Sequence, residues 1–451
     1  MMNSRPIFQY HISGLAELLT EDSPLWHLSI SGTASGGILI HEYFEWAQKF
    51  IQANNYNVLQ EGIRFILNKD CPIEALDQVD IYLEKHGAFY HPARVEVSIK
   101  GHSPLLFVLN TAISPYGLAL INNEYRIMKY LNELDDKHYL PRVFGVKTMS
   151  CRGMQISFFL ATWFDGYKEF HLTKNPDKAE IYNLHLWNGD GSVSTLSHPA
   201  YFEIYDKASE ILTHFYNIKT FEHISPWHHA AGDFITKPTE QGLDVKLITA
   251  RGYDTIVESV VSPETCHDNG HALMGTTKNE SLMSADISKD FHIKDKNYGE
   301  NEKNAYNQEN CNDSGYYRIE DTYKALLLFF LKLTLRMRID RLDGTGDYCM
   351  VDADSIPFIL NGFFRALENK EITTTKKSSE KPFFEKLKAS FSDAFKSYLM
   401  QFSHDNLHTI FLVMTEELHP DNPETSFILK NLRSHSETLF KDIHNHISSV
   451  S

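Results

Sequence analysis

The chain has 451 residues, 42% of them hydrophobic, which is enough to bury a core in about two or three units. Its 43 basic and 59 acidic residues give a formal net charge of −16, which argues against general binding to nucleic acid or to anionic membranes. The five cysteines are scattered without a CxxC pair, so neither a disulfide framework nor a cysteine zinc site is indicated. No signal-peptide pattern opens the chain, and the most apolar run, Ala325 to Leu335, is too short to span a bilayer. We therefore expect a cytoplasmic protein with no membrane partner.

The N-terminal part, residues 1–77, is predicted to form a mainly helical extension. Apolar residues recur at helical spacing in 41–52 and in 58–67, and a Ser/Gly-rich break at 29–38 precedes both segments.

Beyond this extension the pattern changes to strands. Alternating apolar and polar residues predict three strands, at 79–87, 94–100 and 105–113. A helix follows, with Asn122 or Asn123 as its cap and EYRIMKYLNEL behind it. Two more strands are predicted at 140–149 and 155–164.

The remainder of the chain is predicted to be mostly helical. Helical periodicity returns over 200–218, and two short strands follow at 233–237 and 243–250. The stretch 263–316 is polar, Asn-rich and without apolar periodicity, which predicts a mobile insertion. From residue 317 to the end we expect helices, including a buried one at 325–335 and a polar linker at 371–382.

Three strands, a helix, two strands, a hinge and a helical remainder form an order that resembles the protein-kinase-like folds. The detail is most similar to the aminoglycoside and choline phosphotransferase branch. The segments that carry the resemblance lie between Ile81 and Thr255, and they are LLFVLNTAI, NNEYRIMKYLNEL, YLPRVFGV, ATWFDGYKEFHL and SPWHHAAGDFIT with VKLIT. The resemblance implies a two-lobed α+β fold with an N-lobe at 78–166, a helical C-lobe at 167–451, and ATP or another nucleotide with magnesium as cofactor.

The same resemblance assigns roles to individual residues. Glu124 takes the place of the helix glutamate and Asn110 that of the lysine on the third strand. Asp233 takes the place of a metal ligand, His228 that of the catalytic aspartate, and Thr249 that of the second magnesium-binding aspartate. Since phosphoryl transfer needs a cation on the phosphates, magnesium ligands and a base, three of these replacements remove a charged group.

A second alignment frame stays open for the catalytic loop. It reads Gly232-Asp233 as the "G-D" of the family motif, which restores a base but puts Pro238 at a metal-ligand position. We prefer the first frame because it keeps the following strand in register. The expected catalytic residues are therefore His228 in the first frame and Asp233 in the second, and in the first frame Asp233, with Glu124 beside it, is the expected metal ligand.

Basic residues near the first strands favour an anionic ligand. The loop EKHGAFYHPAR has one glycine, whereas a phosphate-cradling loop needs several for its backbone N–H groups to approach. Positive charge would come instead from Lys85, His86, His91 and Arg94. Arg251, directly after the last strand of the resemblance, either clamps a phosphate or carboxylate bidentately or forms a structural ion pair. Glu124 is expected to pair with Arg94.

Two further groups of residues have weaker claims to a site. The sequence RMRIDRLDGTGD at 336–347 predicts a solvated helix end, or a loop that holds a cation. Cys266, His267, His271 and Cys311 are metal-binding residue types, but their irregular spacing in the polar insertion favours no site.

Three functions therefore remain open. The first is a degenerate, pseudokinase-like protein that binds a nucleotide or another anionic small molecule without ordinary ATP–magnesium phosphotransfer. The second is an active but divergent small-molecule phosphotransferase or other nucleotide-dependent transferase that uses His228 or Asp233. The third is a non-enzymatic protein whose helical half binds a protein partner.

Overall fold

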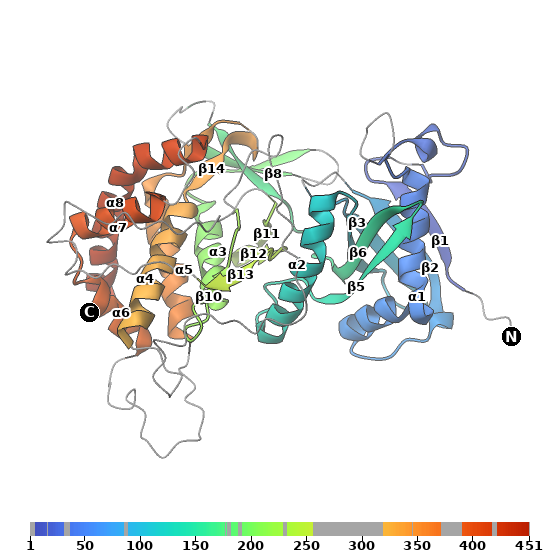
Figure 1. Cartoon of the computed structure of the whole chain (residues 1–451), viewed down its shortest axis with the longest axis horizontal. Helices are drawn as coiled ribbons and strands as arrows, with labels where there is room; N and C mark the ends of the chain where they lie inside the picture. The colour runs from blue at the N-terminus through green and yellow to red at the C-terminus, as the bar shows by residue number, and fades with distance from the viewer. Residues whose placement is uncertain are drawn as a thin grey trace, which may run out of the picture. The chain divides into compact units, whose positions relative to one another are not determined.

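A computed structural model describes most of the chain. The described residues are 5–15, 17–30, 37–84, 89–175, 177, 182–187, 192–228, 232–255, 319–344, 346–370, 390–416 and 422–450. They form two compact units. The first unit comprises Met1–Thr173, Asn183–His198 and His229–Tyr253, and the second comprises Lys174–Tyr182, Pro199–His228 and Asp254–Ser451. The first is rich in strands and the second in helices, so the predicted α+β class is confirmed (Figure 1).

A six-stranded sheet organises the first unit, with the order β1-β2-β3-β4-β6-β5. The strands are β1 Ile7–Ile12, β2 Leu76–Leu83, β3 Ala93–Ile99, β4 Leu105–Ala112, β5 Val143–Cys151 and β6 Met154–Thr162. Neighbours from β2 to β5 pair antiparallel, and helix α2 (Pro115–Leu134) separates β4 from β5 in the sequence. The predicted succession of three strands, a helix and two strands is therefore confirmed.

Strand β1 is an element that the sequence prediction missed. It pairs parallel with β2 and so adds an edge strand where only helices were expected. The alternation was present in the letters IFQYHI, because Phe8, Tyr10 and Ile12 pack on the core while Gln9 and His11 point away from it. The segment was short enough for this signal to be overlooked.

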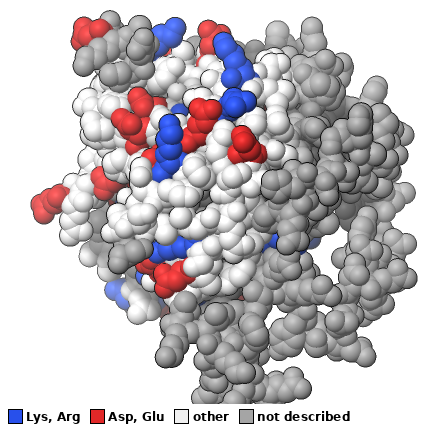
Figure 2. All heavy atoms as spheres, turned by 90° about the vertical axis from the view of Figure 1, so that its left-hand side faces the viewer, with Lys and Arg blue, Asp and Glu red and all other residues white. Residues whose placement is uncertain are grey.

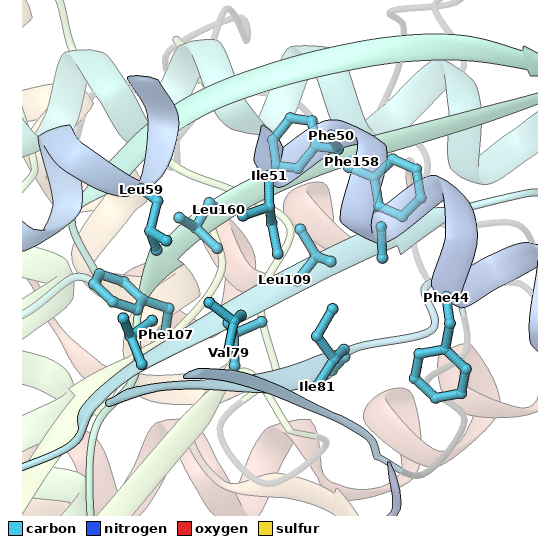
Figure 3. Packing of buried hydrophobic residues seen from close by; sticks show 14 of the residues in the cluster. Phe44, Phe50, Ile51, Leu59, Val79, Ile81, Phe107, Leu109, Phe158 and Leu160 are labelled. Carbon is cyan, nitrogen blue, oxygen red and sulfur yellow. The ribbon is translucent and has the colours of Figure 1, made fainter. Parts of the chain in front are cut away.

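Helix α1 (Ile40–Leu67) covers one face of the sheet. Backbone angles leave the helical region between Ala53 and Tyr56, so the two predicted helices are the two halves of α1. Figure 3 shows apolar side chains of α1 packed on those of the strands. The residues in contact are Phe44, Phe50, Ile51 and Leu59 from α1, with Val79, Ile81, Phe107, Leu109, Phe158 and Leu160 from β2, β4 and β6.

Helix α2 covers the opposite face. Its Tyr125 ring contacts Phe159 of β6, and Phe159 points away from α1 because its neighbours Phe158 and Leu160 point toward it. The predicted cap at Asn122 or Asn123 is wrong. The helix begins two turns earlier, where the Ser114 side chain accepts a hydrogen bond from the N–H of Gly117 and proline occupies the first position.

The first unit also contains smaller strand pairs. The predicted hairpin is confirmed as β11 (Phe234–Thr239) and β12 (Gly242–Leu247). A three-stranded sheet that was not predicted consists of β7 (Phe170–Lys174), β8 (Tyr182–Trp187) and β9 (Val193–Leu196). Another short pair, β10 (Glu222–Ile224) with β13 (Tyr253–Thr255), belongs to the second unit except for Tyr253.

The second unit is mainly helical, as expected. Its helices are α3 Phe202–His214, α4 Ile319–Arg336, α5 Ile356–Glu368, α6 Phe391–Leu399, α7 His404–Glu416 and α8 Pro423–Val450. The apolar run within α4 is buried, as predicted. Among the described residues no helix has the length and apolar character needed to cross a membrane. The predicted insertion at 263–316 and the linker at 371–382 lie outside the described residues.

A hairpin replaces the helix end that was predicted near residue 340. Strand β14 (Ile339–Arg341) pairs antiparallel with β15 (Tyr348–Met350). The chain reverses through Asp343 and Gly344, which have left-handed φ values of 52° and 77°. Aspartate followed by glycine tolerates this conformation well, so the Asp-Gly pair terminates the helical pattern and makes a turn.

On the face of the molecule in Figure 2, the charged side chains of the described residues are mixed in sign. Lysine and arginine side chains lie among aspartate and glutamate side chains, and no large area of a single sign is visible there. The described residues therefore do not form a surface of one sign on this face.

The second unit contains buried histidines that the fold keeps neutral. Arg338 Nη1 lies 2.9 Å from His435 Nδ1, and because a guanidinium only donates, this nitrogen accepts. Burial, followed by the charge of Arg338, lowers the pKa of His435 far below its ordinary value. Burial likewise lowers the pKa of His223 to about 3.

Because the pKa values of these two histidines are lowered in the folded protein, we predict that acid destabilises the second unit. An unfolded histidine takes up a proton near pH 6.5, whereas the folded ones do not, so stability is complete above this pH and is lost below it. Each histidine adds a slope of up to about 1.4 kcal/mol per pH unit. In thermal unfolding between pH 7.5 and 4.5, His435→Gln should show a flatter slope than the wild type. His102→Gln, at an exposed site in the first unit, should not. Equal slopes in the wild type and His435→Gln would contradict this prediction.

Candidate functional site

The candidate site is a buried polar cluster in the first unit, on the α2 side of the sheet. Five side chains form it, and we call it the carboxylate cluster: Tyr90, Glu124, Asp233, Thr249 and Arg251. Tyr90 precedes β3, Glu124 lies on the buried side of α2, and Asp233 directly precedes β11. Thr249 and Arg251 follow β12. The cluster therefore joins segments that are far apart in the sequence.

Glu124 is the centre of one half of the cluster. Its carboxylate is 1% exposed and accepts two hydrogen bonds, from Tyr90 Oη to Oε2 at 2.6 Å and from Thr249 Oγ1 to Oε1 at 2.5 Å. Burial raises the pKa of Glu124, and the two hydroxyl donors and the nearby Arg251 oppose this only in part. Burial and the charge of Glu124 also raise the pKa of Tyr90, so the phenol stays protonated as a donor.

Asp233 and Arg251 form the other half, which is a bidentate ion pair. Arg251 Nη1 donates to Asp233 Oδ2 at 3.1 Å and Nη2 donates to Oδ1 at 2.5 Å. Asp233 is 1% exposed and the Arg251 side chain 19% exposed. Burial lowers the pKa of Arg251, but the Asp233 carboxylate outweighs this and raises it above the ordinary value. This fork geometry is the strongest kind of pairing between an arginine and a carboxylate.

Main-chain contacts hold the cluster in place. The carbonyl of Arg251 accepts from Asn123 Nδ2 at 3.2 Å, and the carbonyl of Asp233 accepts from the N–H of Ile248 at 2.8 Å. The Arg251 guanidinium lies over the Phe89 ring at 5.4 Å. Gly117 allows the chain at Phe89 to approach α2, because a Cβ at Gly117 would lie 2.6 Å from the Phe89 carbonyl oxygen. The donors are thus already oriented toward the two carboxylates.

Four of the residues predicted from the sequence meet in this cluster. They are Glu124, Asp233, Thr249 and Arg251. Of the two roles expected for Arg251, the structure has the ion pair, and the carboxylate that it clamps is that of Asp233. Tyr90 was missed because only basic side chains were considered in its loop. Its one sequence signal was its place between two predicted strands.

The predicted pair of Glu124 with Arg94 is wrong. Arg94 on β3 makes ion pairs with Glu84 and Glu96 and lies 4.1 Å from the centroid of the Tyr82 ring. The sheet register is the reason, since it sets Arg94 directly opposite Tyr82 on β2. Two carboxylates therefore compensate the charge of Arg94.

Other predicted residues lie outside the cluster. Asn110 is on β4, opposite Phe159, and so faces the α2 side of the sheet. His91 is buried, and its carbonyl accepts from the hydroxyl of Tyr43 on α1. Lys85 and His86 lie outside the described residues. His228 belongs to the second unit, so a catalytic pair of His228 with Asp233 stays a prediction.

The arrangement limits what the carboxylates can bind as they stand. Divalent cations such as magnesium prefer carboxylate oxygens, but both oxygens of Asp233 already accept from Arg251. Both oxygens of Glu124 accept from hydroxyl groups. A metal ion at Asp233 would have to displace the guanidinium, and metal binding there stays a prediction.

Comparison with known protein families and with curated proteins found no match for this chain.

Proposed function

We propose that this chain is a degenerate kinase-like protein that binds a nucleotide or another anionic small molecule without magnesium-dependent phosphotransfer. The observation that carries the proposal is the bidentate ion pair between Arg251 and Asp233. In the kinase-like alignment Asp233 is a metal ligand. A guanidinium fixed on it supplies positive charge from the protein itself, where an active enzyme would use a metal ion.

The arrangement of elements supports the kinase-like part of the proposal. An antiparallel run of five strands, β2-β3-β4-β6-β5, contains a helix between its third and fourth strands in sequence, and that helix carries Glu124 inward. The hairpin β11–β12 brings Asp233 and Thr249 to the same helix. This is the order expected of the smaller lobe and the metal-binding hairpin of such folds. The two-lobed arrangement of the whole chain is part of the proposal.

The chemistry of the cluster supports the loss of phosphotransfer. Thr249 carries a hydroxyl that donates to Glu124, where the alignment expects a carboxylate for magnesium. Asn110 carries an amide where the alignment expects a lysine, and an amide does not neutralise phosphate. The cation of the carboxylate cluster is Arg251. Its guanidinium has N–H donors beyond the two that Asp233 accepts, and its side chain is 19% exposed, so an anion can approach it.

The proposal predicts nucleotide binding that does not depend on a metal ion. In calorimetry and thermal-shift assays with ATP, ADP or pyrophosphate, the affinity should be equal with magnesium, with manganese and with EDTA, and no phosphate should be transferred. Arg251→Gln should weaken binding by about tenfold or more, since a charge-assisted hydrogen bond contributes about 1.5–3 kcal/mol. Lys100→Gln removes an exposed cation that pairs with Asp77 and should leave binding unchanged.

Two outcomes would contradict the proposal. Metal-dependent turnover that is lost in Asp233→Asn and His228→Ala would identify a divergent transferase. Absence of binding to every anion tested would favour a protein-binding role for the chain.

A further inference from the structure

Helix α7 in the second unit begins with two histidines one turn apart. His404 and His408 are four positions apart in the sequence, so their side chains lie on the same side of the helix. Their rings are nearly parallel, with centroids 6.3 Å apart and an angle of 17° between the planes. The same spacing on a helix places two imidazoles on one metal ion in many metalloenzymes. Neither histidine belongs to the carboxylate cluster, which lies in the other unit.

The two rings direct one nitrogen each at a single atom of the neighbouring helix. His404 Nε2 lies 3.4 Å and His408 Nδ1 lies 3.3 Å from Ser436 Oγ on α8. Both distances are at the long end of the hydrogen-bond range, so neither contact is a strong bond. The two nitrogens and the hydroxyl oxygen therefore surround one small region of space.

Asp405 and Ser436 are polar neighbours of the two imidazoles. His404 Nδ1 lies 3.2 Å from the Asp405 carboxylate, which is an ion-pair distance. The Ser436 hydroxyl donates to the carbonyl of Arg433 at 2.9 Å, so it presents lone pairs to the histidines. A neutral imidazole whose proton is on its other nitrogen turns a lone pair toward the same small region.

A catalytic Asp–His–Ser arrangement would share these contacts, but burial argues against it. Ser436 is fully buried on α8, so a substrate has no access to its oxygen. The two histidines are partly exposed, so a small ion can reach them from solvent. Arg433 on α8 lies close enough for its charge to act on His408. Arg433 itself is paired with Glu437, which limits its repulsion of a cation.

We propose that His404 and His408 form a binding site for a divalent first-row transition metal, such as Zn²⁺, Ni²⁺ or Cu²⁺. Imidazole nitrogen is a preferred ligand for these ions. The Asp405 carboxylate, 3.2 Å from His404 Nδ1, adds negative charge beside the site, which favours a cation. Two protein ligands leave the other coordination positions to water.

The test uses the full-length chain after dialysis against a chelator. Zinc calorimetry should show one site that is tighter than all others, and Cu²⁺ bound in one equivalent should show coupling to two imidazole nitrogens by electron paramagnetic resonance. His404→Ala and His408→Ala should each weaken the tight site by more than tenfold. Asp405→Asn removes the negative charge 3.2 Å from His404 Nδ1 and should weaken the tight site by less than either histidine variant does, because Asp405 is exposed to solvent.

Controls separate this site from general binding, because the chain has 23 histidines. His444→Ala removes a histidine on α8 that has no partner at the same spacing, and it should leave the tight site unchanged. His404→Gln and His408→Gln keep the volume and serve if an alanine variant does not fold. A tight site that persists in the double variant, or a Cu²⁺ spectrum without imidazole coupling, would overturn the proposal.

Discussion

Replacing Gly362 with alanine is expected to destabilise the second unit by about 3 kcal/mol or more, because it forces two helix backbones apart. A Cβ at Gly362 on α5 would lie 1.9 Å from the carbonyl oxygen of Asp206 and 3.0 Å from the nitrogen of Glu210, both on α3. These are main-chain atoms, so no side-chain rotation relieves the overlap. Separation of the helices would also weaken the buried hydrogen bond from Ser209 Oγ to the Ile359 carbonyl, which is 2.8 Å long.

Urea unfolding followed by circular dichroism measures this effect. Asn361→Ala is the matched control, since it makes the neighbouring residue of α5 an alanine at an exposed position. It should be neutral or slightly stabilising, because alanine has the higher helix propensity. If Gly362→Ala were as stable as Asn361→Ala, the close approach of α3 and α5 would be contradicted.

Removing the Arg251 side chain is expected to destabilise the first unit by about 3–5 kcal/mol. Arg251→Met removes the guanidinium from which both Asp233 oxygens accept, and the Asp233 carboxylate is 1% exposed and close to a second buried carboxylate at Glu124. The cost is that of burying a carboxylate that has lost this guanidinium rather than the energy of the pair itself. Arg251→Met combined with Asp233→Leu removes both charges and should recover most of the lost stability.

A double-mutant cycle from chemical unfolding gives the coupling energy of the pair. Lys100→Met is the control, because it breaks an exposed pair with Asp77 and should cost less than about 1 kcal/mol. A loss in Arg251→Met no larger than in Lys100→Met would show that the buried pair does not stabilise the fold. Because this measurement needs no ligand, its outcome is independent of the nucleotide-binding test.

Local patterns in the sequence were sufficient to predict much of the first unit. The alternation in β3 and β4 and the two apolar stretches of β11 and β12 arise from residues that are close in sequence, and all four strands are present. The start of α2 was misplaced because two asparagines were preferred over the Ser114–Pro115 signal, although that signal was also local. The short strands β7 to β9 were missed for lack of a long enough pattern.

The candidate site was predictable only in its residue types. The sequence determined that Glu124, Asp233 and Thr249 stand where the alignment expects a glutamate, a metal ligand and a magnesium-binding aspartate, and that Arg251 follows the last of these closely. Which of them pair was decided by the tertiary structure, since Glu124 and Thr249 are 125 residues apart. The sheet register likewise places Arg94 where it forms ion pairs with Glu84 and Glu96 instead of with Glu124. Propensity and periodicity act over a few residues, whereas the partner of a buried charge depends on which segments the fold brings together. For this reason the sequence indicated an ion pair as one of two roles for Arg251 but did not identify Asp233 as its partner.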